Sequence, residues 1–280
     1  MIDFQHLTNI AIEAALAAGK IIQKYIDKDI DVATKIGGNT LASQVVTKVD
    51  TACEHIILEH LIPTCTTYDL GLLTEETEDN QSRFEKDYFW CVDPMDGTLA
   101  FINKHPGFSV AIALVSKEGI PYIGVVYNPS TNTIYTAIKD KGAFKNGKPW
   151  QLPQPKNYLT YATDKTLSNT PNKNLIKNLL DKKVKELDLQ SYKEISGAGS
   201  VLNAILVAEN APAMLIKLPK KENGGGSLWD FAATACMFKE LGLQAYTFAG
   251  EQLDLSAKET TYMNDKGIFY TSLAITKTEF

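Results

Sequence analysis

Residues 90–98 read Trp90-Cys91-Val92-Asp93-Pro94-Met95-Asp96-Gly97-Thr98, and this stretch carries the most informative chemistry in the chain. It predicts an apolar strand over Phe89–Val92 that stops at Asp93-Pro94 and delivers two carboxylates, those of Asp93 and Asp96, at a turn. Carboxylate oxygens gathered at the end of a strand can face one point, as hard divalent cations such as Mg²⁺ require. The stretch therefore predicts a candidate metal site.

Gly97 and Thr98 then predict the start of a short helix that continues through Leu99-Ala100-Phe101. The unpaired N–H groups at a helix N-terminus can receive a phosphate group. The alternative is that Asp93 and Asp96 only cap this helix, because short acidic side chains are favoured at that position. Taken alone, the stretch does not choose between a metal site and a helix cap.

Acidic residues also stand at three other predicted strand or helix boundaries. Each has an ordinary explanation: an acidic solvent-facing loop, or an aspartate that caps the helix that follows it. Four separate acidic boundaries would each need such an explanation, whereas one converging site accounts for all of them. The three boundaries are Glu75-Glu76 after Leu72-Leu73-Thr74, Asp50 after Val46-Thr47-Lys48-Val49, and Asp230 after Trp229.

Taken together, these motifs resemble the inositol monophosphatase superfamily. The resemblance rests on V-T-x-x-D ending at Asp50, Glu75-Glu76, D-P-x-D-G-T at 93–98 and W-D-x-A-A at 229–233, and it covers about residues 1–245. It implies an α/β (α+β) fold, a layered αβαβα sandwich. It further implies a Mg²⁺-dependent, lithium-sensitive phosphomonoesterase that forms a homodimer.

The resemblance also implies the roles of individual residues around two or three Mg²⁺ ions. Two ions about 4 Å apart can activate a water molecule and hold the phosphoryl oxygens, while Thr98, oriented by Asp50, positions or deprotonates that water. Converging carboxylates repel one another unless cations neutralise them. The implied metal ligands are Glu75, Asp93, the Met95 carbonyl, Asp96 and Asp230; the catalytic residues are Asp50, Glu75 and Thr98; the substrate contacts are Asp96, Gly97, Thr98, Gly197, Ala198, Lys217 and Asp230.

The chain departs from the family pattern at several positions. Leu99 and Ala100 stand where a polar residue and Asn are usual, and Thr74 stands where Gly is usual. Lys35 matches the mobile-loop lysine of the family only loosely, because the loop that follows it is longer than usual. No departure removes a metal ligand, so we expect activity. Haloacid-dehalogenase phosphatases, which use the first Asp of D-x-D-G-T as nucleophile, are excluded because Pro94 occupies that position.

The leaving group of the substrate is expected to contact the second half of the chain, around Ser196–Ser200 and beyond Ala213–Ile216, where the resemblance implies a strand. Inositol-selective members usually place an acidic residue after the latter segment, but Lys217 stands here, followed by Lys220 and Lys221. Cations suit a second phosphate, unless they are solvent-facing loop charges. We predict an inositol-1-monophosphatase-like activity; the alternatives are a 3′(2′),5′-bisphosphate nucleotidase, a sugar bisphosphatase, or a catalytically silent metal- or phosphate-binding regulator.

Composition excludes several other classes. The 280 residues include 33 Asp+Glu against 28 Lys+Arg, a net charge of −5, so a small phosphorylated substrate is expected as partner and no nucleic acid or membrane. No apolar run approaches the roughly 20 residues of a membrane span, and the first residues do not resemble a signal peptide. Cys53, Cys65, Cys91 and Cys236 form no C-x-x-C pair and predict reduced thiols in a cytoplasmic protein.

Helix and strand patterns alternate along the chain, which predicts a layered α/β architecture. Three prolines in Pro149–Pro155 mark the best candidate boundary. They predict an N-terminal part, 1–150, with most metal ligands, and a C-terminal part, 151–280, with the last ligand and the specificity residues. The predicted helices cover residues 7–26, 50–63, 172–187, 201–209 and 231–241, and the predicted strands 45–49, 89–92, 109–115, 120–127, 133–138 and 158–163.

Overall fold

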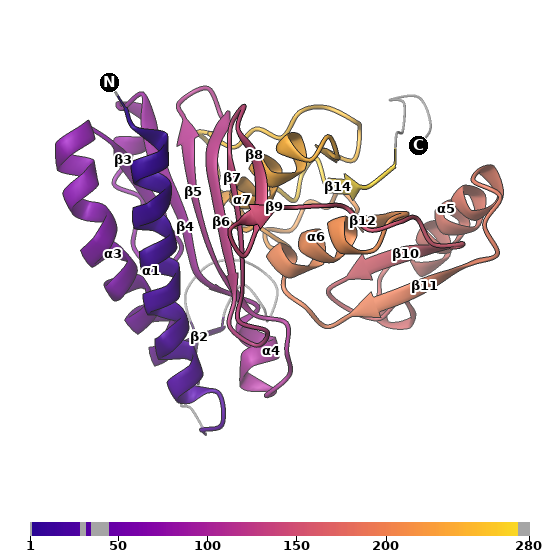
Figure 1. Ribbon diagram of the computed structural model, residues 1–280. Helices are drawn as coiled ribbons and strands as arrows, with labels where there is room; N and C mark the ends of the chain where they lie inside the picture. The colour runs from indigo at the N-terminus through magenta and orange to yellow at the C-terminus, as the bar shows by residue number, and fades with distance from the viewer. Residues whose placement is uncertain (1, 29–31, 35–44, 274–280) are drawn as a thin grey trace.

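Figure 1 shows the computed structural model of the chain, which describes residues 2–28, 32–34 and 45–273. Within these ranges, the short strand β1 (Val32–Thr34) pairs antiparallel with β2 (Val45–Thr47). Lys35, the predicted loop lysine, lies outside the described residues.

Helices and sheets form five layers (Figure 1). Helices α1 (Phe4–Tyr25) and α3 (Lys48–Tyr68) cover one face of a seven-stranded sheet. Helices α6 (Ser200–Glu209) and α7 (Leu228–Glu240) lie between this sheet and a five-stranded sheet, and α5 (Lys173–Glu186) covers the outer face of the latter. The predicted αβαβα sandwich is confirmed.

The seven-stranded sheet has the order β3-β4-β5-β6-β7-β8-β9, so each strand lies beside its neighbour in the chain. Its β3–β4 pair is parallel and the other pairs are antiparallel. The five-stranded sheet, β11-β10-β12-β14-β13, mixes both kinds of pairing. The strands are β3 (Gly71–Thr74), β4 (Tyr88–Asp96), β5 (Ser109–Ser116), β6 (Pro121–Asn128), β7 (Thr133–Ile138), β8 (Gly142–Lys145), β9 (Lys148–Pro149), β10 (Tyr158–Thr163), β11 (Ser191–Ser196), β12 (Ala213–Lys217), β13 (Gln244–Tyr246) and β14 (Ile268–Thr271).

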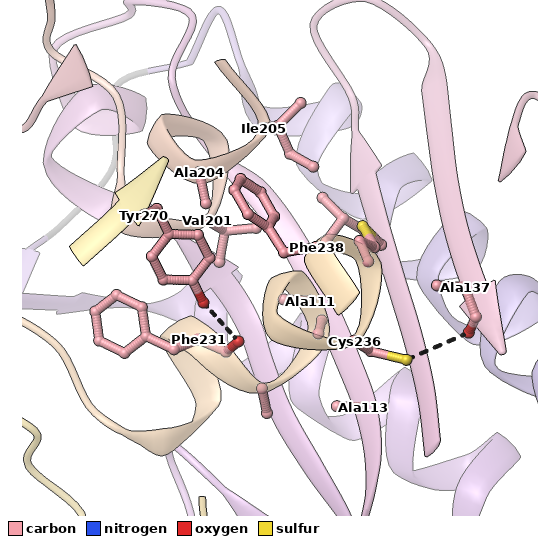
Figure 2. Packing of buried hydrophobic residues seen from close by; sticks show 14 of the residues in the cluster. Ala111, Ala113, Ala137, Val201, Ala204, Ile205, Phe231, Cys236, Phe238 and Tyr270 are labelled. Carbon is pink, nitrogen blue, oxygen red and sulfur yellow. Dashed lines mark hydrogen bonds between the residues drawn. The ribbon is translucent and has the colours of Figure 1, made fainter. Parts of the chain in front are cut away.

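Strand β5 is buried along its whole length because helices cover both faces of the sheet. Small side chains on the face toward α7 let that helix approach closely, and Figure 2 shows several of them around Cys236. At Gly124 of β6, an added Cβ would lie 2.3 Å from the Ala233 carbonyl of α7. Side chains of β5 alternate between two apolar clusters. One cluster, shared with α1 and α3, contains Val110, Ile112 and Leu114; the other, shared with α6 and α7, contains Ala111, Ala113 and Val115.

Two predicted element ends are wrong, and both involve proline. Helix α3 does not end near Pro63 but continues to Tyr68, and Thr64 beside the proline is buried and accepts a 2.8 Å hydrogen bond from the indole of Trp90. Strand β4 does not stop at Asp93-Pro94 but continues to Asp96. Its pairing with β5 shifts by one residue between Asp93 and Asp96, and such a bulge accommodates a proline that cannot donate to the ladder.

Three strands of the five-stranded sheet, β11, β13 and β14, were not predicted. Strand β11 is an edge strand with mostly exposed side chains, so it lacks the apolar pattern that marks a buried strand. The chain passes from one sheet to the other between β9 and β10, within the proline-rich segment. The division into 1–150 and 151–280 stays a prediction, and the apolar cluster between the sheets draws residues from both parts.

Candidate metal and phosphate site

Three carboxylates meet where the bulged end of β4 faces the N-terminus of α7. Asp93, Asp96 and Asp230 each offer one oxygen atom, and these atoms lie within 4.8 Å of one another. Asp93 and Asp96 are buried, and Asp230 is partly exposed. The bulge between Asp93 and Asp96 is what turns both side chains toward the same place, because it breaks the alternation of a regular strand.

Burial and mutual repulsion raise the pKa of each of these carboxyls. The pKa values of Asp93 and Asp96 lie well above the ordinary aspartate value, chiefly because the groups are removed from water, and then because other acidic charges lie beside them. The same causes raise the pKa of Asp230 to about 6. Converging oxygen donors that repel one another in this way fit a hard divalent cation such as Mg²⁺.

Glu75 adjoins this cluster through Asp93. It follows β3, and its backbone N–H donates a 3.2 Å hydrogen bond to the carbonyl of Val92 on β4. The charge of Glu75 raises the pKa of Asp93 and Asp230, which places its carboxylate at the edge of the cluster. Glu75 is partly buried, which disagrees with the alternative of a solvent-facing acidic loop at this position.

Asp50 and Thr98 contact each other next to the cluster. The Thr98 hydroxyl lies 2.9 Å from Asp50 Oδ1 and 3.2 Å from the Met95 carbonyl, and it can donate to either. Asp50 Oδ2 accepts hydrogen bonds from the backbone N–H of Thr47 at 2.7 Å and from its hydroxyl at 2.6 Å. These contacts join the start of α3 to the start of the short helix α4 (Thr98–Ile102).

Asp50 and Asp230 are not the N-cap residues that the capping alternative expected, although both take part in capping their helices. Each occupies the third position of its helix, in a capping box whose N-cap residue is Thr47 or Ser227. Gly97 is the N-cap of α4, so Asp93 and Asp96 do not cap that helix. The pattern T-x-x-D would have identified Thr47 as the cap from sequence alone.

Asp96 instead holds the N-terminus of α6, in the other half of the chain. Its two carboxylate oxygens accept hydrogen bonds of 3.0 Å from the backbone N–H groups of Ser200 and Val201. The N-cap residue of α6, Gly199, has no side chain of its own to supply that bond. A Cβ at Gly199 would lie 2.3 Å from the Asp96 carboxylate, so glycine is required for this approach.

The geometry agrees with the comparison to known proteins. The profile of the inositol monophosphatase family matches residues 3–278. The chain belongs to this family. Inositol monophosphatase 3 of Solanum lycopersicum is 32% identical over 263 residues, which cover 93% of this chain and 92% of that protein.

Solved structures of inositol monophosphatases share the fold. The enzyme from Anabaena (Nostoc) sp. PCC 7120 superimposes with a TM-score of 0.68 at 25% identity, over 96% of this chain and 92% of that chain. An IMPase/NADP phosphatase complexed with Mg²⁺ and phosphate has a TM-score of 0.71 at 20% identity, over 95% and 90%. As a member of a Mg²⁺-dependent family, the chain is a phosphomonoester hydrolase.

Backbone contacts between glycines join the two halves of this inositol monophosphatase family member beside the cluster. The Gly199 N–H donates a 2.8 Å hydrogen bond to the Gly107 carbonyl. A Cβ at Gly107 would lie 2.7 Å from the Gly197 carbonyl and 3.2 Å from the Ala100 side chain. Ala100, one of the departures from the family pattern, thus lies where the loop carrying Gly197 and Ala198 packs.

On the side where the leaving group is expected, Lys217 at the end of β12 is paired with Asp164, which follows β10. The amide of Asn203 donates to Asp164 Oδ1 at 2.9 Å and to the Ala198 carbonyl at 3.0 Å. The charge of Lys217 offsets a small part of the rise in the pKa of Asp96, so the pair lies near the cluster. No pattern in the sequence identified Asp164 or Asn203.

Proposed function

We propose that this chain hydrolyses a small phosphomonoester, with Asp93, Asp96 and Asp230 as the central ligands of two or three Mg²⁺ ions. Glu75 and the Met95 carbonyl, which lie beside that cluster, complete the proposed ligand set. The observation that carries the proposal is the convergence of three acidic oxygens within 4.8 Å beside the Thr98–Asp50 contact. When bound, the ions supply Lewis-acid activation of water and of the phosphoryl oxygens.

The residues of the chain position the attacking water and hold its proton. The Thr98 hydroxyl has one proton, which it donates to Asp50 or to the Met95 carbonyl, so its lone pairs remain to accept a hydrogen bond from water. Burial raises the pKa of Asp50, which makes its carboxylate a better proton acceptor behind that hydroxyl. The backbone N–H groups of Gly97 and Thr98 are proposed to contact the phosphate.

The Lys217–Asp164 pair favours a leaving group without a second phosphate. A lysine already paired with a carboxylate attracts an added anion less strongly than an unpaired one does. We therefore place inositol monophosphates first, and Gly197 and Ala198 are proposed to contact the polyol. The curated relative from tomato is itself named an inositol monophosphatase.

One observation supports the second candidate, a 3′(2′),5′-bisphosphate nucleotidase or sugar bisphosphatase. Lys220 has a lowered pKa because of burial and then because of the nearby charge of Lys217, with Lys165 contributing as well. Three neighbouring lysines form a local cation cluster that a second phosphate can engage if it displaces Asp164.

The decisive experiment measures Mg²⁺-dependent phosphate release from inositol 1-phosphate, 3′-phosphoadenosine 5′-phosphate and fructose 1,6-bisphosphate side by side. We expect the highest kcat/KM with inositol 1-phosphate. A clear preference for either bisphosphate would put the second candidate first. Mg²⁺ binding without phosphate release from any ester would instead indicate the silent regulator, against which the intact set of acidic residues argues.

Three further properties are proposed from the family: lithium inhibition, a homodimer and a cytoplasmic location. Four cysteines without disulfide partners support a reducing compartment. Within the part of the chain that the structure describes, no helix combines the length and the apolar character needed to cross a bilayer.

A further inference from the structure

Glu54 is a buried carboxylate that the proposed mechanism does not use. It lies on α3, one helical turn after Asp50, and its side chain is 6% exposed. Its Oε1 accepts hydrogen bonds from the Thr74 hydroxyl at 2.6 Å and from the Glu76 backbone N–H at 3.2 Å, and its Oε2 accepts one from the Thr77 hydroxyl at 2.9 Å.

These three donors stand on both sides of Glu75. Thr74 precedes it, and Glu76 and Thr77 follow it. The Glu54 carboxylate therefore holds both sides of the turn that carries the Glu75 side chain. The Glu75 backbone is held from the other side by its N–H bond to the Val92 carbonyl. The turn is thus tied to α3 and to β4 at once, which limits the directions in which Glu75 can point.

We propose that Glu54 is a positioning residue that, together with Thr74, aims Glu75 at the Asp93–Asp96–Asp230 cluster and so sets the affinity for Mg²⁺. This inference rests on the proposed function. Partners that hold a metal ligand in place change metal affinity by about 10- to 100-fold when they are removed. Thr74, which stands where the family usually has Gly, is buried and supplies the shortest of the three bonds.

The test compares three variants of the full chain with a matched control. Thr74→Val removes the hydroxyl at nearly constant volume, Thr74→Ser keeps it, and Glu54→Gln replaces one acceptor oxygen by an amide. Thr64→Val is the control, because Thr64 is also a buried threonine next to the sheet. This substitution removes a comparable hydrogen bond, the one that the Trp90 indole donates to the Thr64 hydroxyl. The readouts are the Mg²⁺ dissociation constant by calorimetry and the melting temperature in EDTA.

We expect Thr74→Val and Glu54→Gln to raise the Mg²⁺ dissociation constant about 10-fold, and Thr74→Ser to remain near the wild-type value. Thr64→Val should lower the melting temperature in EDTA without changing Mg²⁺ binding. Unchanged Mg²⁺ affinity in both Thr74→Val and Glu54→Gln would overturn the positioning role and leave the proposed function intact. A wild-type chain that binds no Mg²⁺ would instead overturn the proposed function itself.

Discussion

Asp96 Oδ1 lies 3.0 Å from the backbone N of Ser200, although 104 positions separate the two residues in the chain. This hydrogen bond joins the carboxylate cluster at the end of β4 to the N-terminus of α6. The loop that precedes α6 carries Gly197 and Ala198, the proposed contacts of the leaving group. The proposed metal site and the proposed leaving-group site therefore share one carboxylate, so a change at Asp96 should affect both.

Asp96→Asn should abolish turnover while changing stability little. We expect a loss of at least about 10³-fold in kcat, since a proposed metal ligand is removed. In EDTA, the loss of one acceptor oxygen at the α6 N-terminus should cost about 1 kcal/mol of unfolding free energy, and relief of the repulsion that raises the pKa of Asp96 should offset that cost. Steady-state kinetics and urea denaturation in EDTA measure the two effects.

Asp188→Asn provides the control for this variant, because it makes the same change in charge at an exposed site where Asn accepts the positive φ. It should leave both kcat and stability unchanged. Turnover by Asp96→Asn at the rate of Asp188→Asn would contradict the assignment of Asp96 to the metal site.

Thr98→Ala should lower kcat by about 10² or more, because the hydroxyl that positions the water is lost. Thr98→Ser keeps the hydroxyl and its bond to Asp50, so it should retain most of the activity. Mg²⁺ titrations monitored through the melting temperature should give similar curves for Thr98→Ala and Thr98→Ser. If the alanine variant loses Mg²⁺ binding together with activity, the hydroxyl acts in metal binding and not on the water.

Without metal, stability should fall as the pH rises from about 4 to 7. The raised pKa of Asp230, about 6 against an ordinary 3.8, means that the protonated carboxyl stabilises the fold below pH 3.8. That stabilisation is lost as the pH rises through about 6, at a cost on the order of 3 kcal/mol.

Urea denaturation in EDTA between pH 4 and 7 measures this slope, and added Mg²⁺ should flatten it. Asp230→Asn should reduce the slope without Mg²⁺, because the amide does not titrate while Asp93 and Asp96 still do. Equal slopes with and without Mg²⁺ would show that the ion does not neutralise this cluster.

Lys217→Met should change kcat/KM for inositol 1-phosphate by less than about 3-fold, because the lysine is already neutralised by Asp164. Asp164→Asn releases Lys217 and should raise kcat/KM for 3′-phosphoadenosine 5′-phosphate about 10-fold, equivalent to about 1.4 kcal/mol. Lys177→Met, at an exposed position of α5 away from this lysine group, is the control. A large loss of monophosphate hydrolysis in Lys217→Met would place this lysine on the substrate itself.

Gly107→Ala should raise KM and destabilise the chain, because the added methyl group would push the Gly197 carbonyl away. We expect a loss of about 2–4 kcal/mol from strain and overpacking together. Gly142→Ala provides the control, since Gly142 also has a positive φ but an added Cβ meets nothing within 4 Å. Equal KM values for the two variants would show that the Gly107 contact does not position the leaving-group loop.

Much of the architecture follows from local patterns. Apolar runs predicted β5, β6 and β7 to within a residue or two, and helical spacing predicted α1, α5, α6 and α7 to within a few residues. The pattern did not predict that α3 passes through Pro63 or that β4 passes through Pro94. In both places burial against a neighbouring element outweighs the hydrogen bond that proline cannot make.

The candidate site likewise has a part that the sequence predicted and a part that only the tertiary structure revealed. Residue type and spacing marked Asp50, Glu75, Asp93, Asp96 and Asp230 as candidates but left helix caps and a solvent-facing loop open, and the resemblance to the inositol monophosphatase superfamily selected them as one set. Tertiary structure alone revealed the partners of these groups. Asp96 meets Ser200 across 104 positions, Lys217 meets Asp164 across 53, and Glu54 meets Thr74 across 20. Such pairs depend on how sheets and helices pack, and packing brings together residues whose separation no local pattern encodes.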